Sequence, residues 1–321
     1  MQTDRIKIGT RGSPLALAQA HETRDRLCKA HDLDPALIDV IVISTTGDQI
    51  QNRSLAEIGG KGLFTRELEE QLHDGRIDMA VHSMKDMPAV LPDGLEICCL
   101  LEREDPRDAF MSPVAKSIAD LPEGATVGSS SVRRAAQLLN IRPDLHIVQF
   151  RGNVQTRLRK LDEGVAAATF LACAGLNRLG MSHLITCAID PEIMLPAVAQ
   201  GAIGIEIASA NDRSRALLEP LNHRHTSICI EAERAFLTEL DGSCRTPLAG
   251  HAVIDGGRIA FHGMILSPDG KVWHERRGES STSGGEALGT SIAEALREEA
   301  GTCLLYTSDA ADEGVGGGVS V

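Results

Sequence analysis

The chain has 321 residues and a formal net charge of -13, from 32 Lys and Arg against 45 Asp and Glu. This length is sufficient for two or three domains, each with its own core. The acidic balance and the few aromatic residues (six Phe, one Trp and one Tyr) exclude nucleic acid as the expected partner, and no apolar run approaches the ~20 residues of a membrane span.

The first residues and the cysteines both indicate a cytoplasmic protein. Residues 1–5 lead directly into a predicted strand and lack the apolar region of a secretory signal. No C-x-x-C pair is present among the cysteines of the apolar stretches, so we expect reduced, buried thiols and no zinc site. These cysteines are Cys28, Cys98, Cys99, Cys173, Cys187 and Cys229.

The first third alternates short strands with helices. Apolar stretches predict strands at 5–9, 40–44, 77–82 and 95–101. Ser13 is a good N-cap and Pro14 a good first residue for a helix that continues to about residue 30. A second helix is predicted at 63–73, where Gly75 ends it.

The pattern restarts after the polar segment 103–108, which we interpret as a crossover. It predicts strands at 125–128, 146–150, 166–172 and 202–207 and helices at 132–139, 154–161 and 175–179. Repeated strand–helix units predict mostly parallel sheets that bind ligands beyond the carboxyl ends of their strands. We therefore expect two α/β domains that flank a cleft, one of residues 1–101 plus 198–218 and the other of residues 104–197.

The last third predicts a small α+β domain at 219–302. A helix at 227–240 precedes three strands at 250–254, 258–266 and 271–278, which are joined by short turns typical of an antiparallel sheet. A helix at 286–300 completes it. Residues 303–321 interrupt this helix and carry the only tyrosine, so we expect a non-native or disordered tail.

Arginines recur on glycine- and serine-rich loops at predicted strand ends, at 8–14, 127–134 and 148–153. In the first two loops a helix begins directly afterwards, and a helix N-terminus offers free N–H groups and a positive dipole to an anion. Arginine adds bidentate pairing with carboxylate or phosphate. Because the chain as a whole is acidic, these loops predict a local site for a small polyanion.

Two further loops carry reactive side chains. Ser83, Lys85 and Asp86 follow a predicted strand, where they form either a solvated surface group or, if they face the arginine loops, a clamp with one acid–base group. Cys244 lies in a loop just past a helix, where Arg245 favours its thiolate and the helix dipole opposes it. The residues alone leave both alternatives open.

Together these segments resemble the porphobilinogen deaminase (hydroxymethylbilane synthase) family from about residue 6 to residue 300. Each motif is weak by itself, but seven in the same order at compatible separations are specific. The matching motifs lie at 9–16, 59–64, 81–86, 128–134, 151–154, 174–179 and 242–244.

The resemblance implies two similar periplasmic-binding-protein-like α/β domains that flank a cleft, plus the small α+β domain. It implies a monomeric transferase of porphyrin and haem biosynthesis that joins four porphobilinogen molecules head to tail, with loss of ammonia, into the linear tetrapyrrole 1-hydroxymethylbilane. It also implies a dipyrromethane cofactor, built from the substrate and held by a thioether to Cys244.

The resemblance further implies roles for individual residues. Asp86 matches the catalytic carboxylate, which stabilises the cation formed when ammonia leaves. Each pyrrole carries an acetate and a propionate, so arginines are suited to hold it. The matching substrate-binding residues are Arg11, Ser13, Arg151, Arg157 and Arg178. The matching cofactor-binding residues, besides Cys244, are Ser83, Lys85, Ser129, Ser130, Ser131, Arg133 and Arg134.

One departure from the family pattern is Ala167, where relatives usually carry an acidic residue; we expect a local effect on stability. A two-domain small-anion-binding protein without catalysis is the main alternative, because it shares the architecture, although it would not use Cys244 or Asp86. A phosphate-binding loop at 59–62 is disfavoured, since Leu63 occupies the Ser/Thr position. A cysteine hydrolase would need a histidine positioned beside Cys244.

Overall fold

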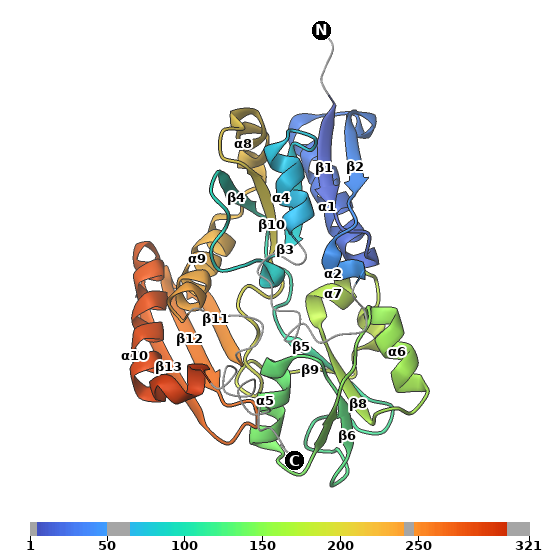
Figure 1. Ribbon diagram of the computed structural model, residues 1–321, viewed down its shortest axis with the longest axis vertical. Coiled ribbons are helices and arrows are strands. Elements are labelled where there is room, and N and C mark those ends of the chain that lie inside the picture. Colours follow the sequence, from blue (N-terminus) through green and yellow to red (C-terminus); the bar gives the residue numbers. More distant parts are fainter. Residues whose placement is uncertain (1–4, 50–64, 241–246, 307–321) are drawn as a thin grey trace, which may run out of the picture.

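The computed structural model describes residues 5–49, 65–240 and 247–306. Its upper lobe in Figure 1 contains a five-stranded sheet of order β2-β1-β3-β10-β4. The strands are β1 (Ile6–Thr10), β2 (Ile38–Val42), β3 (Met79–Ser83), β4 (Leu95–Leu100) and β10 (Ile203–Ala208). Strand β1 runs parallel to β2 and β3, whereas β10 is antiparallel to both β3 and β4. The helices of this lobe are α1 (Pro14–His31), α2 (Thr46–Gln49), α4 (Arg66–His73) and α8 (Asp212–Leu218).

The lower lobe repeats this arrangement with the order β7-β6-β8-β5-β9. Strand β6 runs parallel to β7 and β8, and β5 is antiparallel to β8 and β9. The strands are β5 (Asp108–Met111), β6 (Thr126–Gly128), β7 (His146–Val148), β8 (Ala168–Ala172) and β9 (Cys187–Ala188). The helices are α5 (Val132–Ile141), α6 (Val154–Asp162) and α7 (Cys173–Arg178).

Two crossovers connect the lobes. The outgoing crossover leaves the upper sheet after β4 and leads to β5. The return crossover follows β9 and leads to β10 of the upper sheet. The crossovers touch at Gly201, whose φ is +91° and whose carbonyl oxygen accepts a hydrogen bond from Glu104 N at 3.2 Å. A Cβ at this position would lie 2.4 Å from the Glu104 carbonyl oxygen, so only glycine permits this approach.

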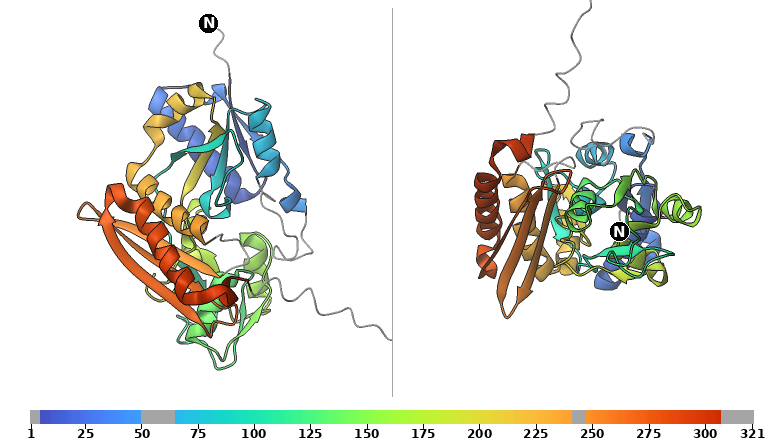
Figure 2. Two further views of the ribbon diagram at one scale, coloured as in Figure 1. Left: turned by 60° about the vertical axis from the view of Figure 1, so that its left-hand side comes forward. Right: turned by 90° about the horizontal axis from the view of Figure 1, so that it is seen from below.

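The third unit is an antiparallel sheet of β11 (Leu248–Asp255), β12 (Arg258–Leu266) and β13 (Trp273–Ser281). Helices α9 (Arg224–Glu239) and α10 (Gly285–Tyr306) pack against it, as Figure 2 shows. Side chains of β12 alternate between buried and more exposed, as expected for a sheet with one covered face. Phe236 of α9 meets Phe261 of β12 with ring centroids 5.1 Å apart, which places the core between helix and sheet.

The third unit contacts both lobes. Arg234 of α9 donates to the carbonyl oxygens of Pro88 and Ala89 in the upper lobe, each at 2.9 Å. Arg277 of β13 pairs with Glu192 beyond β9 at 2.6 Å. Figures 1 and 2 show this unit on one side of the molecule, next to both lobes.

The predicted fold class is confirmed: two α/β lobes with similar five-stranded sheets and a small α+β unit with an antiparallel sheet. The predicted crossover at 103–108 extends one residue too far, because Asp108 is the first residue of the buried strand β5. Strand β2 begins and ends two residues before the predicted 40–44, and α8 and β9 were not predicted. None of the helices within the described residues is long and apolar enough to span a bilayer.

Candidate active site

The N-terminus of α1 lies directly after β1. Ser13 is its N-cap, and the Ser13 hydroxyl accepts a hydrogen bond from Ala16 N at 3.2 Å. No acidic side chain lies in the first turn of α1, and the same holds for α5 and α6. The positive dipole ends of these helices are therefore not neutralised locally and remain suited to an anion.

The turn after β3 presents the residues predicted from the sequence. Met84 and Met87 are buried and anchor the turn, and Met84 N donates to Ala202 O at 3.0 Å. Lys85 is half-buried and Asp86 is exposed. Ser83 is engaged with Gln19 of α1, whose Nε2 lies 2.8 Å from Ser83 Oγ.

Asp108 organises the two adjacent arginines of α5. It pairs with Arg133 at 2.8 Å and with Arg134 at 2.7 Å, and its own side chain has no exposed surface. Burial disfavours ionisation of Asp108, but the two guanidinium charges outweigh this effect and lower its pKa. Because two arginines share one carboxylate, the trio retains one net positive charge.

The remaining edges of these arginines bind backbone oxygens. Arg133 Nη1 donates to Leu195 O at 2.7 Å, and Arg134 Nη1 donates to Phe170 O at 3.0 Å. Asp108 also accepts from Gln200 Nε2 at 2.9 Å, which ties the trio to the return crossover. Sequence reasoning selected the arginines and missed Asp108 and Gln200.

The three serines of the loop before α5 have local partners. Ser131 is the N-cap and accepts from Arg134 N at 3.4 Å, and Ser129 Oγ accepts from Ser131 N at 3.2 Å. Ser130 Oγ accepts from Phe150 N at 3.0 Å. These bonds fix the loop against the end of β7.

Arg157 of α6 has a setting unlike that of Arg133 and Arg134. Its Nε donates to Gly152 O at 2.9 Å, and it forms no ion pair with any carboxylate in the described part of the chain. Burial, together with the positive charges of Arg134 and Arg151, lowers the pKa of Arg157 to about 10. The surroundings of Arg157 are therefore suited to an anionic ligand.

Lys85, in the turn after β3, is a cation of the upper lobe that is influenced by these charges. Burial lowers its pKa; the charges of Asp86 and Asp108 oppose that effect, whereas Arg134 and Arg133 reinforce it. Lys85 therefore lies close enough to Asp108, Arg133 and Arg134 for their charges to act on it. We call Lys85, Arg133, Arg134, Arg151 and Arg157 the cationic cluster.

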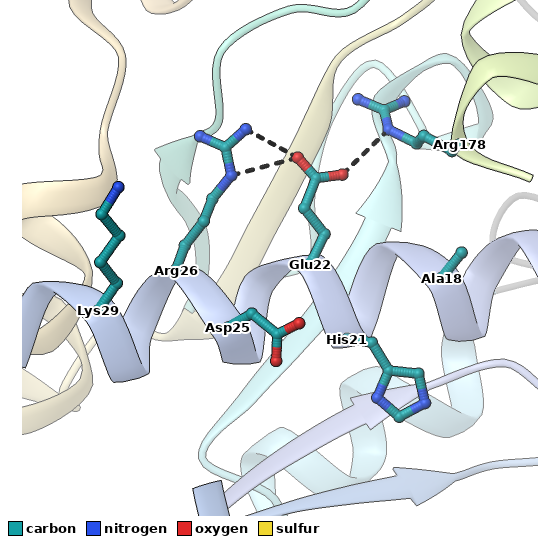
Figure 3. A pocket seen from close by; sticks show the side chains of 7 residues that line it. All are labelled: Ala18, His21, Glu22, Asp25, Arg26, Lys29 and Arg178. Carbon is teal, nitrogen blue, oxygen red and sulfur yellow. Dashed lines mark hydrogen bonds and ion pairs between the residues drawn. The ribbon is translucent and has the colours of Figure 1, made fainter. Parts of the chain in front are cut away.

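Arg178, also predicted from the sequence, has a different setting (Figure 3). Its Nε lies 3.3 Å from Glu22 Oε2 of α1, and its Nη2 donates to Gly201 O at 3.0 Å. The pair borders a surface pocket of about 480 Å³. The residues that line this pocket are Ala18, His21, Glu22, Asp25, Arg26, Lys29 and Arg178.

A second buried carboxylate joins the third unit to the crossovers. Glu233 of α9 pairs with Arg103 at 2.6 Å and accepts backbone hydrogen bonds from Ala199 N at 2.6 Å and Ala252 N at 2.8 Å. Both crossovers and β11 therefore meet at one side chain. The apolar positions of α9 predicted its helix, but nothing local predicted this role for Glu233.

Several predicted features lie outside the described residues: Cys244, the 59–62 loop and the tail beyond residue 306. The six predicted buried cysteines are free thiols that are buried or half-buried. Burial raises the pKa of Cys98, Cys99 and Cys173 to about 12, which makes them poor nucleophiles.

His251 and His262 lie in β11 and β12, as predicted, and burial lowers the pKa of both. Among the described residues, no group of three or more His, Cys, Asp or Glu is placed to hold a metal ion. Ala167 is half-buried beside the core of the lower lobe, where its carbonyl oxygen accepts from Ser112 Oγ at 2.7 Å.

Comparison with known proteins agrees with this arrangement. Residues 6–216 match the family model described as porphobilinogen deaminase, dipyromethane cofactor binding domain, and residues 227–298 match porphobilinogen deaminase, C-terminal domain. The porphobilinogen deaminase of Paracoccus denitrificans (strain Pd 1222) is 57% identical over 297 residues, which is 92% of this chain and 94% of that protein.

Solved structures with a similar chain trace include two other proteins. A periplasmic substrate-binding protein of an ABC transporter from Coxiella burnetii has a TM-score of 0.41 and 13% identity, over 67% of this chain and 91% of that chain. A lipoprotein of the YaeC family from Enterococcus faecalis V583 has a TM-score of 0.40 and 14% identity, over 68% of this chain and 90% of that chain.

Proposed function

We propose, from the membership of this chain in the porphobilinogen deaminase family, how its residues carry out the family reaction. The enzyme is a transferase, hydroxymethylbilane synthase, which joins four porphobilinogen molecules into 1-hydroxymethylbilane in tetrapyrrole biosynthesis. Each addition releases ammonia and brings two more carboxylates into the site. The site therefore needs cations for the carboxylates and an acid–base group near the reacting carbon.

The cationic cluster meets the first need, and the setting of Arg157 is the observation that carries the proposal. A half-buried guanidinium with two cationic neighbours and no carboxylate partner among the described side chains is costly without a bound anion. A charge-assisted hydrogen bond to a carboxylate contributes about 1.5–3 kcal/mol. Arg151 and Arg157 bind the acetate and propionate groups of the growing chain, and Arg11 and Ser13 act similarly at the N-terminus of α1.

Asp86 meets the second need. It is exposed on a turn held rigid by the buried Met84 and Met87, and it adjoins Lys85. A carboxylate in this position accepts hydrogen bonds from pyrrole N–H groups, stabilises positive charge on the pyrrole as ammonia leaves, and moves the proton of the reacting carbon. Lys85 contributes a donor to substrate carboxylates.

The residues present fit a dipyrromethane cofactor. Its four carboxylates are complementary to the cationic cluster, whose five cations outnumber the one buried carboxylate among the described residues that pairs with them, Asp108, and to the acid-free first turns of α5 and α6. The residues that would hold these carboxylates are Ser83, Lys85, Ser129, Ser130, Ser131, Arg133 and Arg134, and Cys244 would supply the thioether sulfur. When bound, the cofactor supplies the pyrrole carbon to which the first substrate is joined.

We further propose the organisation in which this chemistry occurs. Residues 1–101 with 198–218, residues 104–197 and residues 219–302 form the three domains, and the enzyme is a monomer of the cytoplasm. The crossovers and Glu233, which contacts both, support this division. Size-exclusion chromatography with light scattering at micromolar concentration tests the monomer.

The mass of the intact protein tests the proposal. Wild type and Cys244→Ser are expressed in cells that make porphobilinogen, and their masses are compared with those of the bare chains. We expect wild type to exceed its chain mass by two pyrrole units and the variant to carry no addition. An unmodified wild type that also stays unmodified after incubation with porphobilinogen would contradict the proposed chemistry.

A further inference from the structure

Arg178 joins three segments that are far apart in the sequence. It ends α7 in the lower lobe, pairs through Nε with Glu22 on α1 of the upper lobe, and donates through Nη2 to Gly201 O on the return crossover. Figure 3 shows its guanidinium facing the Glu22 carboxylate across the space between α1 and α7. The pair is therefore a direct polar link between the two lobes.

The geometry fixes both partners. The Arg178 side chain is 8% exposed, and burial lowers its pKa despite the opposing charge of Glu22. The second oxygen of Glu22, Oε1, accepts from Arg26 Nε at 3.2 Å and from Arg26 Nη2 at 2.8 Å. A carboxylate held at both oxygens loses little further entropy in the pair, unlike an exposed surface ion pair.

The outgoing crossover belongs to the same contact. Asn177, next to Arg178, donates through Nδ2 to Glu104 Oε1 at 3.0 Å, and Glu104 N donates to the same Gly201 oxygen that Arg178 contacts. The end of α7 is thus bonded to α1 and to both crossovers. Any rotation of one lobe against the other must change these bonds.

We infer that Arg178 and Glu22 form a latch between the lobes, and that Arg178 serves the reaction by controlling their separation rather than by binding substrate carboxylates. This inference rests on the proposed function, in which the cleft must accommodate a chain that grows from two pyrroles to six. Weakening the latch changes the late additions, which need the most space, and leaves attachment of the cofactor intact. Glu22 is a positioning residue under this inference, since a carboxylate cannot bind an anionic chain.

A double-mutant cycle tests the latch with Glu22→Gln, Arg178→Gln and the double variant, each as holoenzyme. Asp25→Asn is the matched control, because Asp25 borders the same pocket but pairs only with its neighbour Arg24 among the described residues. After a short pulse of porphobilinogen, intact mass gives the proportion of enzyme with three or four added units. We expect each single variant to change this proportion in the same direction by about three- to tenfold, and the double variant to match the larger single effect. Asp25→Asn should match wild type.

Hydrogen exchange provides a readout independent of turnover. Amides of the crossovers, at 101–107 and 199–202, should exchange several-fold faster than in wild type in both single variants. In the double variant they should exchange no faster than in the faster of the two single variants. The latch would be overturned if Glu22→Gln had the intermediates and hydrogen exchange of wild type while Arg178→Gln stalled. Arg178 would then be assigned to substrate binding. The latch would also be overturned if the effect of the double variant equalled the product of the two single effects, because the two residues would then act independently. A wild type without the two-unit mass would refute the proposed function instead, and the exchange cycle would still decide the latch.

Discussion

Replacing Asp108 by Asn should destabilise the lower lobe strongly. The substitution keeps the shape of the side chain but removes the only carboxylate that pairs with Arg133 and Arg134 among the described residues. The side chains of both arginines are less than a tenth exposed, so water cannot replace the lost charge. Removing one partner of a buried ion pair costs about 3–5 kcal/mol, and here two cations lose the same partner.

The assay is urea unfolding followed by circular dichroism. We expect the free energy of unfolding to fall by about 3–5 kcal/mol at pH 7 for the transition that includes the lower lobe. Asp144→Asn is the matched control, since Asp144 pairs with Arg142 at the more exposed end of α5, and its loss should cost far less than that of Asp108. A loss below about 1 kcal/mol for Asp108→Asn would refute the view that this carboxylate holds the arginines.

The pH dependence gives a second check. The pKa of Asp108 is lower in the folded protein than in the unfolded chain, where it is about 3.9. Its contribution to stability is therefore fully present above pH 3.9 and is lost as the pH falls towards the folded-state pKa. The difference between wild type and Asp108→Asn should decrease by about 1.4 kcal/mol per pH unit below this point. A difference that is constant between pH 3 and pH 7 would contradict the ionised pair.

Three further predictions concern the reaction and the crossovers. Asp86→Ala should abolish tetrapyrrole formation while the melting temperature stays within about 2 °C, since Asp86 is exposed; normal turnover would refute its role. Sulfate should raise the melting temperature of the cofactor-free enzyme, and Arg157→Leu should lose this gain, whereas Arg159→Leu, on the exposed side of the same helix, should keep it. Gly201→Ala should lower the free energy of unfolding by about 2 kcal/mol or more. The control Gly180→Ala should lower it by about 1 kcal/mol, because Gly180 also has a positive φ but has open space around it. Equal losses in the two variants would contradict the close approach of the crossovers.

Local signals in the sequence predicted most elements of the fold. Ser13 and Pro14 begin α1 as predicted, because capping depends on residues within one helical turn. Strand β5 was missed since its first residue, Asp108, is charged and is stabilised in the sheet by arginines 25 and 26 residues later. The Glu22–Arg178 pair was missed for the same reason, as its partners are 156 residues apart.

Sequence motifs singled out several arginines but could not separate their tasks, because the carboxylates that neutralise some of them lie in distant segments. Arg103 pairs with Glu233 of α9, and Arg178 pairs with Glu22 of α1. These two arginines therefore join separate parts of the fold. Arg157 has no such partner in the described chain, so its charge remains available to a ligand. The role of an arginine in this protein therefore depends on whether a carboxylate lies beside it. That acid comes from a distant segment, which only the folded chain reveals.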